Sequence, residues 1–275
     1  METVSENACF GGVQGVYTHA SDACGCDMTF GLFLPEEAKS GPVPVLWYLS
    51  GLTCTHANAM EKAGAQAWAA DAGIALVFPD TSPRGDDVAD DDAYDLGKGA
   101  GFYVDATEAP WAPHFKMWSY VSEELPALIG TMGCDLERQA ITGHSMGGHG
   151  ALTIAMGHPG RFRSVSAFAP IGNPTASDWG QKQLGAYLGS NEGTWAKHDA
   201  TLQMAAQGLD APLLIDTGTK DQFIDLLRPE SLAAAIAARR QQAVFRLQPG
   251  YDHSYFFVSS FMADHVAFHA EALFG

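Results

Sequence analysis

The sequence predicts an α/β fold, with a mostly parallel central sheet, helices on both faces and an antiparallel edge at the N-terminus. Two observations carry this prediction. Near-continuous apolar runs, typical of strands covered on both faces, alternate with helix-like segments along most of the chain. Before them, residues 10–34 alternate apolar and polar side chains around glycines, which is typical of an antiparallel hairpin.

The predicted parallel part begins with a βαβ unit. Two apolar runs at 43–51 and 73–80 enclose a helix-like segment at 59–73. An amphipathic segment at 114–133 follows, and because it contains Pro126 we expect a kink there or a helix that begins late. Further strands are predicted at 139–143, 164–170, 212–218 and 243–250, with helices at 151–157 and 231–240.

Residues 171–208 interrupt this alternation, and we interpret them as an insertion above the strand ends. Such insertions often form the walls of an active site. The 275 residues contain no internal repeat, low-complexity tract or linker. We therefore expect residues 1–275 to form a single domain around one large core.

The charge of the chain excludes some classes of partner. It has 32 acidic and 15 basic residues, a formal net charge of −17, which repels phosphate backbones and anionic lipid surfaces. Nucleic acid is therefore not an expected partner. Much of the acid lies in residues 86–95, which we interpret as a solvated loop because the run lacks the ligand spacing of an EF-hand.

The N-terminus lacks the basic and apolar segments of a secretion signal, and no stretch approaches the roughly 20 apolar residues that span a bilayer. The five cysteines are odd in number and irregularly spaced, so reduced thiols are favoured over a disulfide framework. Cys24 and Cys26 are too close together to indicate a zinc site. A soluble cytoplasmic protein is the expectation, with no membrane partner.

The motif TGHSMGGHGAL at 142–152 carries the strongest chemical signal. It places Ser145 between Gly143 and Gly147, where a predicted strand turns sharply into a predicted helix. This is the arrangement of the nucleophile elbow of an α/β-hydrolase fold, in which the glycines permit a strained turn that exposes the serine Oγ. We predict that Ser145 is a catalytic nucleophile.

A serine nucleophile needs a base, and in this fold the acid and then the histidine follow the serine along the chain. The segment GYDHSYFF places His253 in a turn between a strand and a helix, where it can reach back over the sheet ends. His144 flanks the elbow and His149 lies one turn along the helix, so neither easily faces the Oγ while being held by an acid. We predict His253 as the base.

His265 and His269 have the i, i+4 spacing of a metal-binding pair, but no third ligand accompanies them. We expect both on the surface of the terminal helix, and we predict no metal site. The remaining histidines lack supporting context, namely His19, His56, His114, His158 and His198.

The acid should follow a strand in a loop, where it can orient the imidazole. The segment DTGTKDQF offers Asp216 at the strand end and Asp221 in the loop. We favour Asp221 and expect Asp216 to be buried in a structural role. Asp225 and Asp252 are weaker alternatives.

Acyl transfer also requires donors for the oxyanion, usually the N–H after the nucleophile and one from the loop after an early strand. These would be the backbone N–H groups of Met146 and Leu52.

Seven segments spread along nearly the whole chain resemble the S-formylglutathione hydrolase family, also called the esterase D family. They are YLSGLTCT, KAGAQAWAADAGIALVFPDTSPRG, DDAYDLGKGAGFYVDAT, GHSMGGHGAL, SAFAPIGNP, LRPE and LQPGYDHSYFF. The motifs beyond the elbow make the resemblance specific. It implies hydrolysis of S-formylglutathione to formate and glutathione in formaldehyde detoxification, without a metal or organic cofactor, by a homodimer.

By position, the resemblance assigns the triad to Ser145, Asp221 and His253, with the oxyanion donors at Leu52 and Met146. Cys54 lies where many members carry a cysteine beside the active site, so thiol reagents are expected to inhibit, although a packed thiol without a role in turnover is an equal alternative. The chain departs from the common pattern in its acidic loop and at Gly172, where a cysteine is frequent. These changes affect charge and packing rather than the triad.

The resemblance also raises an electrostatic question, because glutathione is anionic and the chain is strongly acidic. Local positive charge is available from Lys62, Arg84, Lys98 and Lys182, none of which the sequence assigns. The sequence likewise does not decide whether Trp111 and Trp179 lie in the core or in the active site. Two alternatives remain for the function: a general short-chain carboxylesterase, and an inactive hydrolase fold that serves as a binding module.

Overall fold

The computed structural model describes residues 1–275 and contains one sheet of nine strands in the order β1-β2-β3-β5-β4-β6-β7-β8-β9. The strands are β1 (Glu2–Cys9), β2 (Gly12–Ser21), β3 (Cys26–Leu34), β4 (Val43–Leu49), β5 (Ala75–Pro79), β6 (Cys134–Gly143), β7 (Phe162–Phe168), β8 (Leu213–Gly218) and β9 (Ala243–Gln248). Strands β1 to β3 are antiparallel and β3 joins β5 antiparallel, whereas all pairs from β5 to β9 are parallel. The predicted fold class is confirmed.

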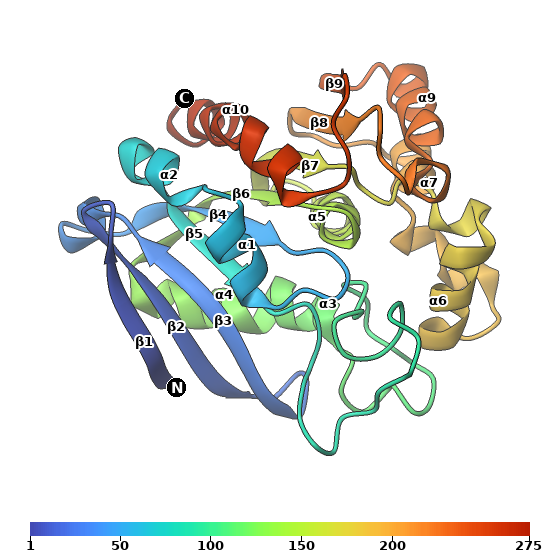
Figure 1. Ribbon diagram of the computed structural model, residues 1–275, viewed down its shortest axis with the longest axis horizontal. Helices are drawn as coiled ribbons and strands as arrows, with labels where there is room; N and C mark the ends of the chain where they lie inside the picture. Colours follow the sequence, from blue (N-terminus) through green and yellow to red (C-terminus); the bar gives the residue numbers. More distant parts are fainter.

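Helices cover both faces of this sheet (Figure 1). The helices are α1 (His56–Lys62), α2 (Gln66–Ala72), α3 (Met117–Ser119), α4 (Leu125–Ile129), α5 (Met146–Gly157), α6 (Asp178–Leu188), α7 (Ala200–Ala206), α8 (Ile224–Leu227), α9 (Pro229–Arg239) and α10 (Tyr255–Phe274). Helices α1, α2 and α10 lie in front of the sheet in Figure 1, and α4 and α5 lie behind it. No helix combines the length and the apolar character needed to cross a membrane.

The burial of the strands explains the apolar runs in the sequence. Every residue of β4, β5 and β8 is buried, because helices cover both sides of these central strands. Strand β1, at the free edge, is mostly exposed and is correspondingly polar. The predicted antiparallel edge begins only at residue 10 and omits β1, because the polar sequence of β1 buries little apolar surface.

Two helical segments differ in detail from the prediction. The single helix expected over 59–73 is two helices, α1 and α2, separated at Gly64, whose φ of +70° is left-handed and ends the helical hydrogen bonding. The irregularity expected near Pro126 is confirmed. A π-helical segment at Tyr120–Glu124 runs directly into α4, and Pro126, which has no N–H to donate, is the second residue of α4.

The prediction that His265 and His269 lie on the surface is wrong, because both imidazoles are fully buried between α10 and the sheet. His265 contacts the Ser166 Oγ through Nδ1 at 2.8 Å and the Asp216 carboxylate through Nε2 at 3.2 Å. His269 contacts Ser166 at 2.7 Å and Ser164 at 2.8 Å. The i, i+4 spacing therefore serves the contact of α10 with β7, where hydrogen bonds offset the burial of polar rings.

Asp216 has the structural role that the sequence predicted. Its carboxylate is fully buried and accepts two hydrogen bonds of 2.6 Å from Arg246 on β9. Burial alone would raise the pKa of Asp216, but the hydrogen bonds from His265 and Arg246 outweigh it and lower the pKa to about 2. The ion pair thus ties the ends of β8 and β9 to α10.

The fold contains five histidines whose side chains are almost completely buried: His144, His149, His198, His265 and His269. Burial lowers the pKa of each below the ordinary value of 6.5, to about 4 for His149 and about 3 for His198. The folded chain therefore holds these rings neutral at a pH at which the unfolded chain protonates them.

We predict that the free energy of unfolding falls as the pH is lowered from about 7.5 to about 5.5, because only the unfolded state takes up protons at these histidines in that range. Each such histidine contributes a slope of up to about 1.4 kcal/mol per pH unit. Urea unfolding at a series of pH values measures the effect. A denaturation midpoint that stays constant over this range would contradict the assignment of neutral buried rings.

Candidate active site

Ser145 lies at the sharp turn between β6 and α5, with a backbone conformation of φ 58° and ψ −119°. A positive φ at a residue with a side chain costs about 1–3 kcal/mol and persists only where its surroundings enforce it. Here the Ser145 N–H donates to the carbonyl of Phe168 at the end of β7, and the Ser145 carbonyl accepts from the N–H of His149. The neighbouring strand and the helix thus hold the serine in its strained conformation.

Two glycines make this turn possible. A Cβ at Gly147 would lie 1.9 Å from the carbonyl oxygen of Leu49, and a Cβ at Gly143 would lie 2.2 Å from the carbonyl oxygen of Gly147. Both distances are far inside van der Waals contact, so only glycine fits. The turn can therefore pack directly against the end of β4.

Asp221 and His253 meet at the same end of the sheet, from two loops. Asp221 follows β8, and His253 lies between β9 and α10. The Nδ1 of His253 lies 2.6 Å from the Oδ2 of Asp221, whose side chain is fully buried, while Oδ1 accepts from the N–H of Phe223 at 2.8 Å. An Nδ1–H donated to this carboxylate leaves Nε2 as the free, basic nitrogen of the ring.

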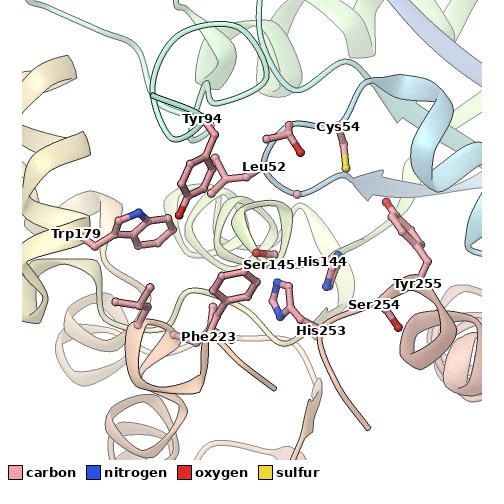
Figure 2. A pocket seen from close by; sticks show the side chains of 14 residues that line it. Leu52, Cys54, Tyr94, His144, Ser145, Trp179, Phe223, His253, Ser254 and Tyr255 are labelled. Carbon is pink, nitrogen blue, oxygen red and sulfur yellow. The ribbon is translucent and has the colours of Figure 1, made fainter. Parts of the chain in front are cut away.

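Figure 2 shows the His253 ring beside the side chain of Ser145, and both residues line one pocket. The structure therefore brings together the three predicted residues Ser145, Asp221 and His253. Of the alternative acids, Asp216 is bonded to Arg246, whereas Asp252 accepts from the N–H and hydroxyl of Ser254.

The loop after β4 carries Leu52 to the mouth of the elbow, where it lines the same pocket. Its N–H makes no hydrogen bond within the protein. Met146 is the first residue of α5, and its N–H belongs to the first turn, where the N–H groups have no acceptor inside the helix. Two backbone N–H groups without an acceptor inside the protein thus lie near Ser145.

Several hydrogen bonds hold the loop that carries Leu52. The Tyr103 hydroxyl donates to the carbonyl of Ser50 at 2.9 Å, and the N–H of Thr53 donates to the carbonyl of Gly99 at 2.9 Å. Arg84 donates to the carbonyl of Cys54, also at 2.9 Å. The glycine-rich segment around Gly99 therefore helps to hold the loop in place.

The pocket has a volume of about 310 Å³ and two chemically different walls (Figure 2). One wall is largely apolar and carries Leu52, Tyr94, Trp179 and Phe223; the other carries Cys54, His144, Ser254 and Tyr255. Leu226 and Leu227 also line the pocket. Trp179 comes from α6, so the insertion at 171–208 does form a wall of the pocket. Sequence reasoning missed most of these residues, and only their proximity to the triad in the chain could have indicated Phe223 and Tyr255.

Cys54 is buried beside this pocket. Burial raises the pKa of its thiol above the ordinary value and outweighs the nearby Tyr255 hydroxyl and Lys62, which lower it. The group is therefore a neutral thiol at neutral pH.

The basic residues named above differ in how far they are neutralised. Lys182 is bonded to Asp95 at 2.7 Å, and the Arg84 Nε lies 3.1 Å from both oxygens of Asp80. Lys62 and Lys98 form no ion pair. Trp111, by contrast with Trp179, belongs to the core, where it packs against other aromatic rings.

Comparison with known proteins identifies the family of the chain. The model of the Esterase family matches residues 21–268. The chain is 66% identical to the S-formylglutathione hydrolase of Paracoccus denitrificans over 273 residues, which are 99% of this chain and 98% of that protein.

Solved structures of related proteins have the same fold. An S-formylglutathione hydrolase from Agrobacterium tumefaciens superimposes with a TM-score of 0.97 at 49% identity, covering 99% of this chain and 100% of the other. The fluorophosphonate-binding serine hydrolase F of Staphylococcus aureus matches with a TM-score of 0.76 at 17% identity, covering 94% and 98%. This second likeness concerns the fold alone.

We predict that Gly147→Ala loses more than about 4 kcal/mol of unfolding free energy, because its Cβ would collide with the backbone of β4. Gly185→Ala in α6 is the matched control, since its Cβ would meet nothing closer than Trp195 at 3.7 Å. That variant should be neutral or gain roughly 0.5–1 kcal/mol from higher helix propensity. Chemical denaturation of both variants measures the difference, and equal stabilities would show that the close approach at Gly147 is not required.

Proposed function

The chain belongs to the S-formylglutathione hydrolases of the Esterase family, and we propose that it acts as a serine thioesterase that converts S-formylglutathione to formate and glutathione. The observation that carries the proposal is the 2.6 Å contact between Asp221 and His253 beside Ser145, in a chain 66% identical to a hydrolase of that name. The following steps describe the chemistry that these residues would perform.

In the first step, the Nε2 of His253 takes the proton of the Ser145 hydroxyl as the Oγ attacks the formyl carbon of the thioester. The carbonyl oxygen becomes an oxyanion, which accepts hydrogen bonds from the N–H groups of Leu52 and Met146. Asp221 keeps the imidazole in the required tautomer and stabilises its charged form. The strained turn at Ser145 supports this step because it presents the Oγ at the open end of the sheet.

In the second step, the carbon–sulfur bond breaks and the glutathione sulfur leaves, taking the proton from the His253 imidazolium. A thiolate is a good leaving group, because the ordinary pKa of a thiol is only about 8.5. A water molecule then gives a proton to His253 and attacks the formyl group on Ser145. Collapse of this second intermediate returns the proton to the Ser145 Oγ and releases formate.

This scheme routes every proton through His253 and requires neither a metal ion nor an organic cofactor. The pocket supports a small acyl group, since its 310 Å³ is bounded by the bulky side chains of Trp179, Phe223 and Tyr255. Most of the glutathione portion would extend beyond it toward the surface.

A general short-chain carboxylesterase is the second candidate, and the apolar wall of the pocket favours it because that wall suits any small ester. The ratio of kcat/KM for S-formylglutathione to that for a small aryl acetate distinguishes the two. Only a glutathione thioesterase gains from contacts to the glutathione portion. An inactive binding module is disfavoured by the complete set of Ser145, Asp221 and His253, and a fluorophosphonate probe that failed to label Ser145 would favour it.

We further propose that the chain works as a homodimer in the cytoplasm. The five unpaired cysteines support a reducing compartment, and the exposed strand β1 leaves a free sheet edge for a partner. Light scattering of the purified chain tests the dimer, and a monomeric mass at micromolar concentration would contradict it. Fractionation of the cells that express the chain tests the compartment.

We predict that Ser145→Ala abolishes hydrolysis of S-formylglutathione and that Asp221→Asn lowers kcat by about 10⁴-fold, because the amide no longer holds the productive tautomer of His253. Steady-state kinetics measures both effects, with Asp225→Asn as the matched control at an acid that does not contact His253. Activity near that of the unaltered chain in Ser145→Ala would overturn the proposal.

The charge of the protein should appear in the kinetics. With a net charge of −17, the protein repels an anionic thioester at low ionic strength. We predict that kcat/KM for S-formylglutathione rises when ionic strength increases from about 0.01 M to about 0.15 M, which shortens the Debye length from about 30 Å to about 8 Å. A neutral aryl ester should show no such rise. A fall for S-formylglutathione would indicate that local cations, not net charge, dominate its approach.

We propose that Cys54 is the residue through which thiol reagents inhibit, because its side chain lines the pocket beside Ser145. Burial keeps the thiol neutral, so modification should be slow at neutral pH and faster at alkaline pH. Cys54→Ser should keep its turnover and lose its sensitivity to a small alkylating reagent, as followed by residual activity over time. Loss of turnover in that variant would instead assign Cys54 to catalysis.

A further inference from the structure

The catalytic imidazole lies in a row of four rings that crosses the pocket (Figure 2). The centroid of the His253 ring is 5.1 Å from Phe223, at an interplanar angle of 77°, and 4.5 Å from His144, at 42°. The centroid of Tyr255 lies 5.6 Å from His144 at the far end. His253 is thus held between an aromatic ring on one side and a second imidazole on the other.

The two flanking rings differ in how firmly they are fixed. Phe223 is 36% exposed, on the loop that follows Asp221. His144 is 5% exposed, and its backbone N–H donates to the carbonyl of Leu49 at 3.0 Å. Because His144 directly precedes Ser145, one rigid segment sets the positions of both the nucleophile and the ring that touches the base.

The His144 side chain has no other evident task. Both of its ring nitrogens are buried and neither makes a hydrogen bond of standard geometry, which is an unfavourable arrangement for a polar ring. Burial, and then the charge that His253 can carry, hold the pKa of His144 well below its usual range and outweigh the backbone of His253, which raises it. An uncharged ring does not repel the imidazolium that forms on His253, whereas a protonated one would.

The hydrogen bond from Nδ1 to Asp221 restrains χ2 of His253, but small coupled rotations about χ1 and χ2 that displace Nε2 are limited only by packing on the faces of the ring. We infer that His144 is a positioning residue, whose imidazole packs on His253 and keeps its Nε2 directed at Ser145. This inference rests on the catalytic roles proposed above for Ser145 and His253. It extends them by assigning a function to the histidine of the elbow itself.

The test compares His144→Ala and His144→Phe with His149→Ala in the full-length chain, using S-formylglutathione and a small aryl ester. His149 is the matched control, because it lies in the same elbow helix, is 1% exposed, also has two unpartnered ring nitrogens and does not line the pocket. We expect His144→Ala to lower kcat by roughly ten- to hundredfold on both substrates, with KM changed less than about twofold. His144→Phe, which refills the space with a ring, should recover most of that loss.

The split between kcat and KM, and the rescue by His144→Phe, provide readouts that a purely structural role would not move. His149→Ala, by contrast, should lose stability and keep its kcat. Unchanged kcat in folded His144→Ala would overturn the inference, as would a loss confined to the thioester. If His144→Ala does not fold, His144→Phe decides the test. A kcat near that of the unaltered chain supports the inference, and a kcat lowered tenfold or more contradicts it. Activity of Ser145→Ala would instead refute the proposed function, whatever the His144 variants show.

Discussion

The close approach of the elbow to the end of β4 is the constraint on which the rest of the site depends. Ser145 can keep a φ of 58° because Gly143 and Gly147 carry no side chains, so the turn can pack directly against the neighbouring backbone. The cost of this conformation is offset by the hydrogen bonds of Ser145 to β7 and to α5, and by the burial of the helix that follows. The nucleophile is therefore fixed by packing, before any substrate is present.

The order of the parallel strands then determines which residues can join the serine. Strands β8 and β9 lie beyond β7, so the loops at their carboxyl ends open beside the elbow and deliver Asp221 and His253. The buried ion pair between Asp216 and Arg246, with His265 of α10, fixes these strand ends against the helix that begins just after His253. The acid and the base are thus carried on loops whose ends are well anchored.

The sequence predicted those parts of the site that depend on local chain geometry. A glycine-flanked serine between a strand and a helix, and a histidine between a strand and a helix, have readable signatures, so Ser145 and His253 could be named. Four carboxylates fit the position of the acid, and the loop position of Asp221 and the resemblance to a known family both favour Asp221. The walls of the pocket had no such signature, because Tyr94 and Trp179 arrive from segments far apart in the chain.

The errors have the same origin. The sequence predicts His265 and His269 on the surface because polar rings on a terminal helix normally face water. Their hydrogen-bond partners, the serines of β7, lie about 100 residues away in the chain and leave no local signal. The sequence does not predict the edge strand β1, because β1 is defined by its pairing with β2 and not by apolar residues. The periodicity of the local sequence does not indicate tertiary hydrogen bonds of this kind.

The central claim is that Ser145 carries the formyl group during turnover. Rapid quenching of the protein with S-formylglutathione, followed by mass spectrometry of the elbow peptide, tests this most directly. The account predicts a peptide heavier by one formyl group in place of a hydrogen, located on Ser145, that forms before steady-state release of formate. Release of formate with no formylated peptide at any quench time, under conditions that preserve a formyl ester, would contradict it.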